Sequence, residues 1–215
     1  MAYAQSVFSN VAPHVRIHYN QPAELIAIEG AIQKLKSREK GAQLLDLLNS
    51  VTRDHKRVHI AMSTDGGTDF SAELTSQQVK KYNINPDPTS DEHFEFVHKI
   101  ASVQPNGQKG EGAMPVISFN PNKSIYIDNE GFPYYVNDKT QSFVCLAHEL
   151  IHAFHTLNGT STATDPDDNF PGSGQEFEEH RAVGMGIHAN NTLSENVIRR
   201  EHGLPLRAHY FLRPR

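Results

Sequence analysis

The segment 147–155 carries the residues best suited to chemistry in this chain, because it contains the pattern His-Glu-x-x-His at His148, Glu149 and His152. In a helix, residues four positions apart lie on one face with an axial rise of about 6 Å, so both imidazoles can reach one metal ion. The intervening glutamate can reach a water molecule beside that ion. This combination is typical of zinc hydrolases, with the two histidines as Zn²⁺ ligands and Glu149 as general base.

The residues around the motif predict a buried helix. Apolar side chains fall on more than one side of it, at Phe143, Val144, Leu146, Leu150, Ile151 and Phe154. Buried His and Glu are costly unless they are paired or bind a metal. We therefore expect a metal-binding helix that begins near Asp138 or Thr140 and ends at Asn158-Gly159.

The helix itself does not supply the third ligand that a catalytic zinc requires. His155 shares the face, but seven residues of helix rise about 10.5 Å, too far for one ion to bond both ends at about 2.1 Å. His155 is therefore expected to line the pocket or to lie at the surface. The extended pattern HExxHxxGxxH also fails, because Asn158 stands where its third histidine would be.

An acidic residue on a following helix is the other common source of a third ligand. We favour Glu179, because Ala182 and Val183 follow it at i+3 and i+4 and indicate that its face turns inward. Glu178 is the alternative. Asp165, Asp167 and Asp168 are remoter candidates, since they lie in a polar, Pro/Gly-rich segment typical of a loop.

Composition excludes several classes of partner. The chain has 215 residues, a formal net charge of −5 and no run of Lys or Arg, which argues against nucleic acid or an anionic membrane as partner. It shows neither a secretory signal pattern nor 18 consecutive apolar residues. Cys145 is the only cysteine, so no intrachain disulfide can form, and we expect it to pack in the core. We assume a monomer.

The order of the expected elements, helices then strands then helices, predicts an α+β fold in which a small, mostly antiparallel sheet packs on the motif helix. Besides the motif helix, we expect helices at 23–35 and 175–188, one that is capped by Ser37, and one that starts at the capping pattern 192–195. We expect strands at 57–63, 116–119, 124–127 and 132–136. Residues 1–20 are expected to be flexible and 21–215 to form a single domain. We interpret 74–112 as a long irregular excursion with a short helix at 92–102.

The C-terminal half resembles a known family. Residues 148–155 (HELIHAFH), 178–184 (EEHRAVG) and 194–210 (SENVIRREHGLPLRAHY) are similar to the NleD-type zinc metallopeptidases, which bacterial pathogens inject into host cells through a type III secretion system. The resemblance implies a compact Glu-zincin fold and cleavage of host mitogen-activated protein kinases of the JNK and p38 type in the activation loop. It assigns His148, His152 and Glu179 as ligands and Glu149 as base, and it places the enzyme in the host cytoplasm.

The proposed hydrolysis needs a donor for the oxyanion besides the metal. Tyr210 and Arg207 are the candidates, with His180 and His188 as weaker ones. The strand 124–127 is expected to be the edge along which an extended substrate pairs.

Two other classes compete with a zinc endopeptidase. The first is a zinc hydrolase that acts on another substrate. A deformylase-type enzyme of this class is disfavoured, because such enzymes take a Cys ligand from a distant segment, whereas Cys145 lies on the motif helix. A binding module with a structural zinc is the other, but such sites are closed by four protein ligands and have no use for Glu149.

Overall fold

The computed structural model describes residues 3–53, 55–63, 66–163 and 172–212 of the chain. The helices in this part are α1 (Pro22–Lys36), α2 (Glu39–Val51), α3 (Ser76–Tyr82), α4 (Asp91–Ala101), α5 (Ser142–Leu157), α6 (Gly174–Val183), α7 (Glu195–Glu201) and a 3₁₀ turn, η1 (Gly186–His188). The strands are β1 (Gln5–Phe8), β2 (Val15–Tyr19), β3 (Val58–Met62), β4 (Asp69–Glu73), β5 (Met114–Phe119), β6 (Ser124–Ile127) and β7 (Pro133–Val136). The predicted α+β class is confirmed. Among the described residues, no helix combines the length and apolar character needed to cross a membrane.

The main sheet has five strands in the order β1-β2-β3-β5-β4. The central pairs, β2 with β3 and β3 with β5, are parallel, whereas the outer pairs are antiparallel. The prediction of a mostly antiparallel sheet is therefore wrong for this sheet, which is mixed. The reason lies in the connections, because α1 and α2 lead from β2 to β3, and α3 and α4 lie between β4 and β5 in the chain; such long crossovers permit parallel neighbours.

The N-terminal segment contributes two of these strands, contrary to the flexibility expected over residues 1–20. In β2 the residues Val15, Ile17 and Tyr19 are buried, and the intervening two are half-buried. This alternation is the ordinary signature of a strand with one face against a core. The segment is thus part of the sheet.

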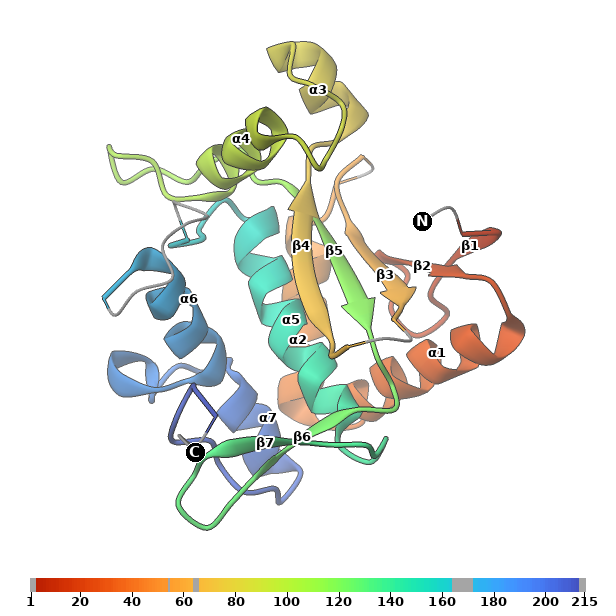
Figure 1. Cartoon of the computed structure of the whole chain (residues 1–215), viewed down its shortest axis with the longest axis vertical. Helices are drawn as coiled ribbons and strands as arrows, with labels where there is room; N and C mark the ends of the chain where they lie inside the picture. Colours follow the sequence, from red (N-terminus) through yellow and green to blue (C-terminus); the bar gives the residue numbers. More distant parts are fainter. Residues whose placement is uncertain (1–2, 54, 64–65, 164–171, 213–215) are drawn as a thin grey trace.

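The core fixes where the motif helix lies relative to the sheet. Ile17, Ile60 and Ile117 stand opposite one another across three strands, are fully buried, and belong to one apolar cluster with α1, α2 and α5. Phe70 on β4 continues this row opposite Ile117, and its ring centroid lies 5.7 Å from that of His152. The helix α5 contacts α1, α2, β5, α6 and α7, so it runs through the middle of the fold (Figure 1).

The segment 74–112 contains two helices, α3 and α4, and part of a small core, which corrects its interpretation as an irregular excursion with one short helix. Thr75 and Gln78 form a capping box at the start of α3, and the Ser90 hydroxyl accepts a hydrogen bond from the backbone of His93 at the start of α4. Leu74, Val97, Ile100, Ala101 and Ala113 form a second, smaller core beneath these helices. The short helix expected at 92–102 is confirmed, shifted by one residue.

The strand Ser124–Ile127 does not belong to the main sheet. It forms β6, which pairs antiparallel with β7 in a separate two-stranded sheet near the foot of α5 in Figure 1. Instead, β4 is the last strand of the main sheet on the side of the motif helix, and its outer edge has no strand partner among the described residues.

Three helix boundaries differ from the predictions for local reasons. The first turn of α2 is capped by the carboxylate of Glu201, which accepts hydrogen bonds from the backbone of Lys40 (2.8 Å) and Gly41 (3.0 Å), so Ser37 is not the cap. The helix α6 stops at Gly184, whose φ of 82° is left-handed and suits glycine. The cap of α7 is Ser194 rather than residue 192.

Candidate active site

The two histidines of the motif lie one turn apart on α5 and face the same point. Their exposed fractions are 9% and 6% for His148 and His152, and their ring centroids are 4.8 Å apart. The helix can carry these polar groups because most of its other side chains, from Phe143 to Leu157, are buried in the core. The Nε2 atoms of the two rings are 3.1 Å apart.

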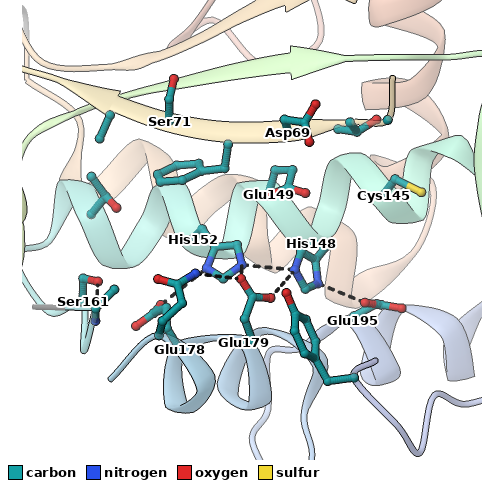
Figure 2. Close-up of a pocket in the computed structure, with 18 of the residues that line it drawn as sticks. Asp69, Ser71, Cys145, His148, Glu149, His152, Ser161, Glu178, Glu179 and Glu195 are labelled. Atoms are coloured by element: carbon teal, nitrogen blue, oxygen red, sulfur yellow. Dashed lines mark hydrogen bonds and ion pairs between the residues drawn. The ribbon is translucent and has the colours of Figure 1, made fainter. Parts of the chain in front are cut away.

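Helix α6 brings Glu179 to the same point (Figure 2). Its carboxylate oxygens lie 3.1 Å from Nε2 of His148 and 3.4 Å from Nε2 of His152. Ala182 and Val183, the residues that predicted its inward orientation, are fully buried. The position of Glu179 therefore follows from α6 burying its apolar face against the core.

The spacing of these three groups fits a tetrahedral metal ion. Ligand atoms bonded at about 2.1 Å to a tetrahedral ion stand about 3.4 Å apart, close to the separations of 3.1–3.4 Å in the cluster. His148, His152 and Glu179 form a group whose possible ligand atoms all lie within 4.8 Å of one another. The structure thus brings together the three ligands proposed from the sequence.

The outward nitrogen of each imidazole faces a second carboxylate. Nδ1 of His148 lies 2.9 Å from Oε2 of Glu195, and Nδ1 of His152 lies 3.6 Å from Oε1 of Glu178. In metal sites such carboxylates accept the Nδ1–H and leave the Nε2 lone pair free for the metal. Glu178, the alternative ligand from the sequence, therefore lies on the far side of His152 from the cluster and also pairs with Arg181.

Buried charge in the cluster favours a cation. Burial alone would lower the pKa of His152, but Glu179 and Glu178 raise it well above its usual value. Burial would likewise raise the pKa of Glu179, yet the two imidazoles hold it far below its usual value. The carboxylates around the two imidazoles thus favour positive charge at this point, which a bound divalent ion would supply.

Glu149 points from α5 toward β4, away from Glu178 and Glu179 (Figure 2). It lines a cleft of about 550 Å³ together with His148, His152, Glu179 and residues 67–72 of the β4 region. Burial, with the charges of Glu179 and Asp69, raises the pKa of Glu149 to about 7 against the opposing effect of the two histidines. A carboxyl group of this kind can accept and release a proton near neutral pH.

Comparison with known proteins shows the family of this chain. The model of the Peptidase M91 family, described as an effector protein family, matches residues 26–210. The chain belongs to this family. Membership in this peptidase family, together with the His-His-Glu cluster, supports the interpretation of the chain as a metallopeptidase.

The solved structures that match this chain include chains of botulinum neurotoxins. The serotype F light chain matches with a TM-score of 0.43 and 14% identity over 71% of this chain and 48% of that chain. The catalytic domain of serotype F matches with a TM-score of 0.44 and 14% identity, over 80% of this chain and 53% of that chain. The serotype HA light chain matches with a TM-score of 0.41 and 12% identity, over 83% of this chain and 46% of that chain. The M91 chain spans about half the length of these neurotoxin chains. No curated protein sequence matches it.

Tyr210 lines the cleft of the M91 protein, as expected for an oxyanion donor. Burial and a hydrogen bond to Glu179 raise the pKa of its hydroxyl, which is therefore protonated at neutral pH. Arg207 is buried and engaged: it donates to Glu195 (3.1 Å) and to the backbone carbonyls of His209 and Tyr210. Arg207 therefore holds the segment that carries Tyr210.

The remaining candidates lie apart from the cluster or outside the described residues. His180 pairs with Glu176 at 3.8 Å and His188 lies in η1; neither lines the cleft. His155 lies 3.1 Å from the Thr160 hydroxyl near the end of α5, and it is not one of the clustered ligands. Cys145 lines the cleft but is buried, which raises its pKa to about 12 and keeps the thiol protonated. Asp165, Asp167 and Asp168 lie outside the described residues.

Glu195 is the site residue that sequence reasoning missed. Its sequence position suggested only a helix-capping acid, but it is 2% exposed and joins His148 to Arg199 (2.6 Å) and Arg207 (3.1 Å). Arg199 is 0% exposed and also donates to the backbone carbonyl of Ile125 (3.0 Å). The available signal was the pairing of Glu195 with Arg199 at i+4 on one helix face.

Glu195→Gln is expected to weaken both zinc binding and folding. The substitution removes the carboxylate that orients His148, which should raise the Kd for zinc about 10–100-fold. It also leaves the buried Arg199 without an opposite charge, at a cost of about 3–5 kcal/mol. Competition with a chromophoric chelator measures the first effect, and urea unfolding of the metal-free protein measures the second.

Glu201→Gln is the matched control, because Glu201 lies on the same helix and caps α2. It should cost about 1 kcal/mol and leave zinc affinity unchanged. Equal zinc affinity in Glu195→Gln and wild type would refute the role given to Glu195.

Proposed function

We propose that this protein is a zinc endopeptidase in which His148, His152 and Glu179 hold the metal. The observation that carries the proposal is the meeting of these three side chains, at 3.1–3.4 Å, in a cleft that also contains Glu149 and Tyr210. Three ligands in an open cleft are typical of a catalytic zinc, whereas a structural zinc is closed by four.

A metal held by His148, His152 and Glu179 would supply Lewis acidity, which would polarise the substrate carbonyl and make water more acidic. Glu149 lines the cleft between α5 and β4, where it can take a proton from the attacking water and pass it to the leaving nitrogen. Tyr210 keeps its proton and can donate a hydrogen bond to the carbonyl oxygen as negative charge develops. Arg207 positions Tyr210 through its backbone.

The substrate binds as an extended strand along β4 in this proposal. β4 ends the main sheet, and residues 67–72 line the cleft directly. Backbone pairing at such an edge is a common way to hold a peptide. The strand 124–127, expected to serve as this edge, lies in the separate two-stranded sheet and lines the cleft only with Ser124 and Ile125, whereas β4 and the residues before it line the cleft from 67 to 72.

Tyr210→Phe is expected to lower kcat for peptide cleavage about 10²–10³-fold, because the transition state loses one hydrogen-bond donor. Zinc affinity should change little, since the ring is retained and Tyr210 is not a ligand. Steady-state kinetics on a fluorogenic peptide, with zinc content measured in parallel, checks this. A kcat within threefold of wild type would remove Tyr210 from the mechanism.

The biological setting of the proposal rests on the NleD-type resemblance. We propose that the protein is delivered by a type III secretion system into the host cytoplasm, acts there as a monomer, and cleaves host kinases of the JNK and p38 type in the activation loop. The effector description of the M91 family supports delivery into a host.

The decisive experiment incubates the zinc-loaded protein with purified p38 and JNK, and identifies fragments by mass spectrometry. Wild type should give one cleavage within the activation loop, and Glu149→Ala or excess chelator should abolish it. Cleavage of casein but of neither kinase would support the proposed peptidase activity and reject the proposed kinase substrates. Zinc binding with no cleavage of any protein would favour a hydrolase for another substrate or a structural zinc.

A further inference from the structure

The cleft extends beyond the His-His-Glu cluster to helix α4. This end is lined by Ala72 of β4, Phe94, Val97, His98 and Ala101 of α4, and Ser161 and Ala163 after α5, so His98 is the one ionisable side chain that α4 contributes. Because α4 belongs to the segment 74–112, this segment forms a wall of the cleft. None of the catalytic steps above uses these residues.

We propose that this end of the cleft is a specificity subsite that binds an apolar side chain of the substrate, on a residue N-terminal to the scissile bond. The proposal rests on the endopeptidase function proposed above and adds a sequence preference to it.

The surface of this subsite suits an apolar partner. Phe94 is 45% exposed, and its ring meets that of His98 edge-on, with centroids 4.7 Å apart. Val97 and Ala101, about one and two turns farther along α4, are 3% and 4% exposed, so they present a closed apolar base. A substrate side chain that covered the Phe94 ring would remove apolar surface from water on both partners.

The two walls of the subsite are tied together. The carbonyl of Ala163 accepts a hydrogen bond from the Ser102 hydroxyl (3.1 Å) and lies 3.2 Å from Nδ1 of His98. A parallel bridge joins Ser102 to Ser161. The spacing between α4 and residues 161–163 is therefore set before a substrate binds, which lowers the entropic cost of binding.

The direction of β4 places this subsite on the N-terminal side of the scissile bond. β4 runs from Asp69, which lies near Glu149, past Ser71 (Figure 2), and its end points toward α4 (Figure 1). The backbone N–H of Leu74, directly after β4, donates to Nε2 of His93 on α4 at 3.0 Å. A peptide that pairs antiparallel to β4, the slightly more stable arrangement, has its N-terminal residues at this end.

The test uses the full zinc-loaded chain and a set of peptides varied one position at a time around the cleavage site. Wild type should prefer Leu, Ile or Phe over Ala, Asp or Lys by about 10-fold or more in kcat/KM at one position N-terminal to the bond. Phe94→Ala should remove most of this preference. Ala163→Leu should fill the subsite and shift the preference to smaller side chains.

Phe96→Ala is the matched control, because Phe96 lies on the same helix but packs its ring against that of Tyr82 (centroids 4.8 Å apart) and does not line the cleft. It should leave the preference unchanged, and all variants should bind zinc as wild type does. The subsite is overturned if the wild-type enzyme is active but shows no preference for apolar side chains, or shows that preference only C-terminal to the scissile bond. It is also overturned if the preference persists in Phe94→Ala. Failure of wild type to cleave any peptide overturns the proposed function, and the subsite with it.

Discussion

Glu149→Gln is expected to lower kcat/KM for peptide cleavage by about 10²–10⁴-fold while zinc stays bound. The substitution keeps the shape of the side chain but removes the group that accepts the proton of the attacking water. Zinc affinity should be near that of wild type, because the cluster of His148, His152 and Glu179 does not include Glu149.

Stability should not fall in this variant. Burial raises the pKa of Glu149 to about 7, so the folded protein holds the charged form at a cost that glutamine avoids. Activity assays with zinc in excess, zinc content by mass spectrometry and urea unfolding form one set of measurements. Wild-type turnover in Glu149→Gln would mean that another group accepts the proton.

The central part of the site was predictable because it rests on short-range patterns. His148 and His152 share a helix face by their spacing, and the apolar residues after Glu179 orient it through helical periodicity. Each of these signals spans at most one turn of helix, so the sequence displays it directly. The structure then places the three side chains within 3.1–3.4 Å of each other.

The parts that were missed depend on contacts between distant segments. β4 has the sequence Asp-Phe-Ser-Ala-Glu, without a clear apolar alternation, and becomes a strand because it pairs with β5, more than 40 residues later. Glu195 stands at a helix start, where an acid is ordinary, and only the fold brings it to His148 and Arg207. Neither partner is visible from the local sequence.

Glu179→Gln is expected to have the largest effect on the metal. An amide oxygen is a poor zinc ligand, so the variant loses one of three protein ligands, and the Kd for zinc should rise by more than the roughly 10–100-fold that the loss of an outer carboxylate causes. The zinc-dependent rise in Tm should shrink accordingly, because a bound ligand stabilises by RT ln(1 + [L]/Kd). Cleavage should fall with zinc occupancy.

Glu178→Gln separates the two candidates for the third ligand. Glu178 lies at Nδ1 of His152 and pairs with Arg181, so its loss should weaken zinc binding only about 10–100-fold, as for other outer carboxylates. The structure therefore predicts the order Glu179→Gln, then Glu178→Gln, then wild type, from weakest to tightest zinc binding. The reverse order for the two variants would make Glu178 the ligand and require α6 to turn about its axis. Such a rotation would carry the fully buried Ala182 and Val183 out of the core, and the cost of exposing them is the physical reason for assigning the metal to Glu179.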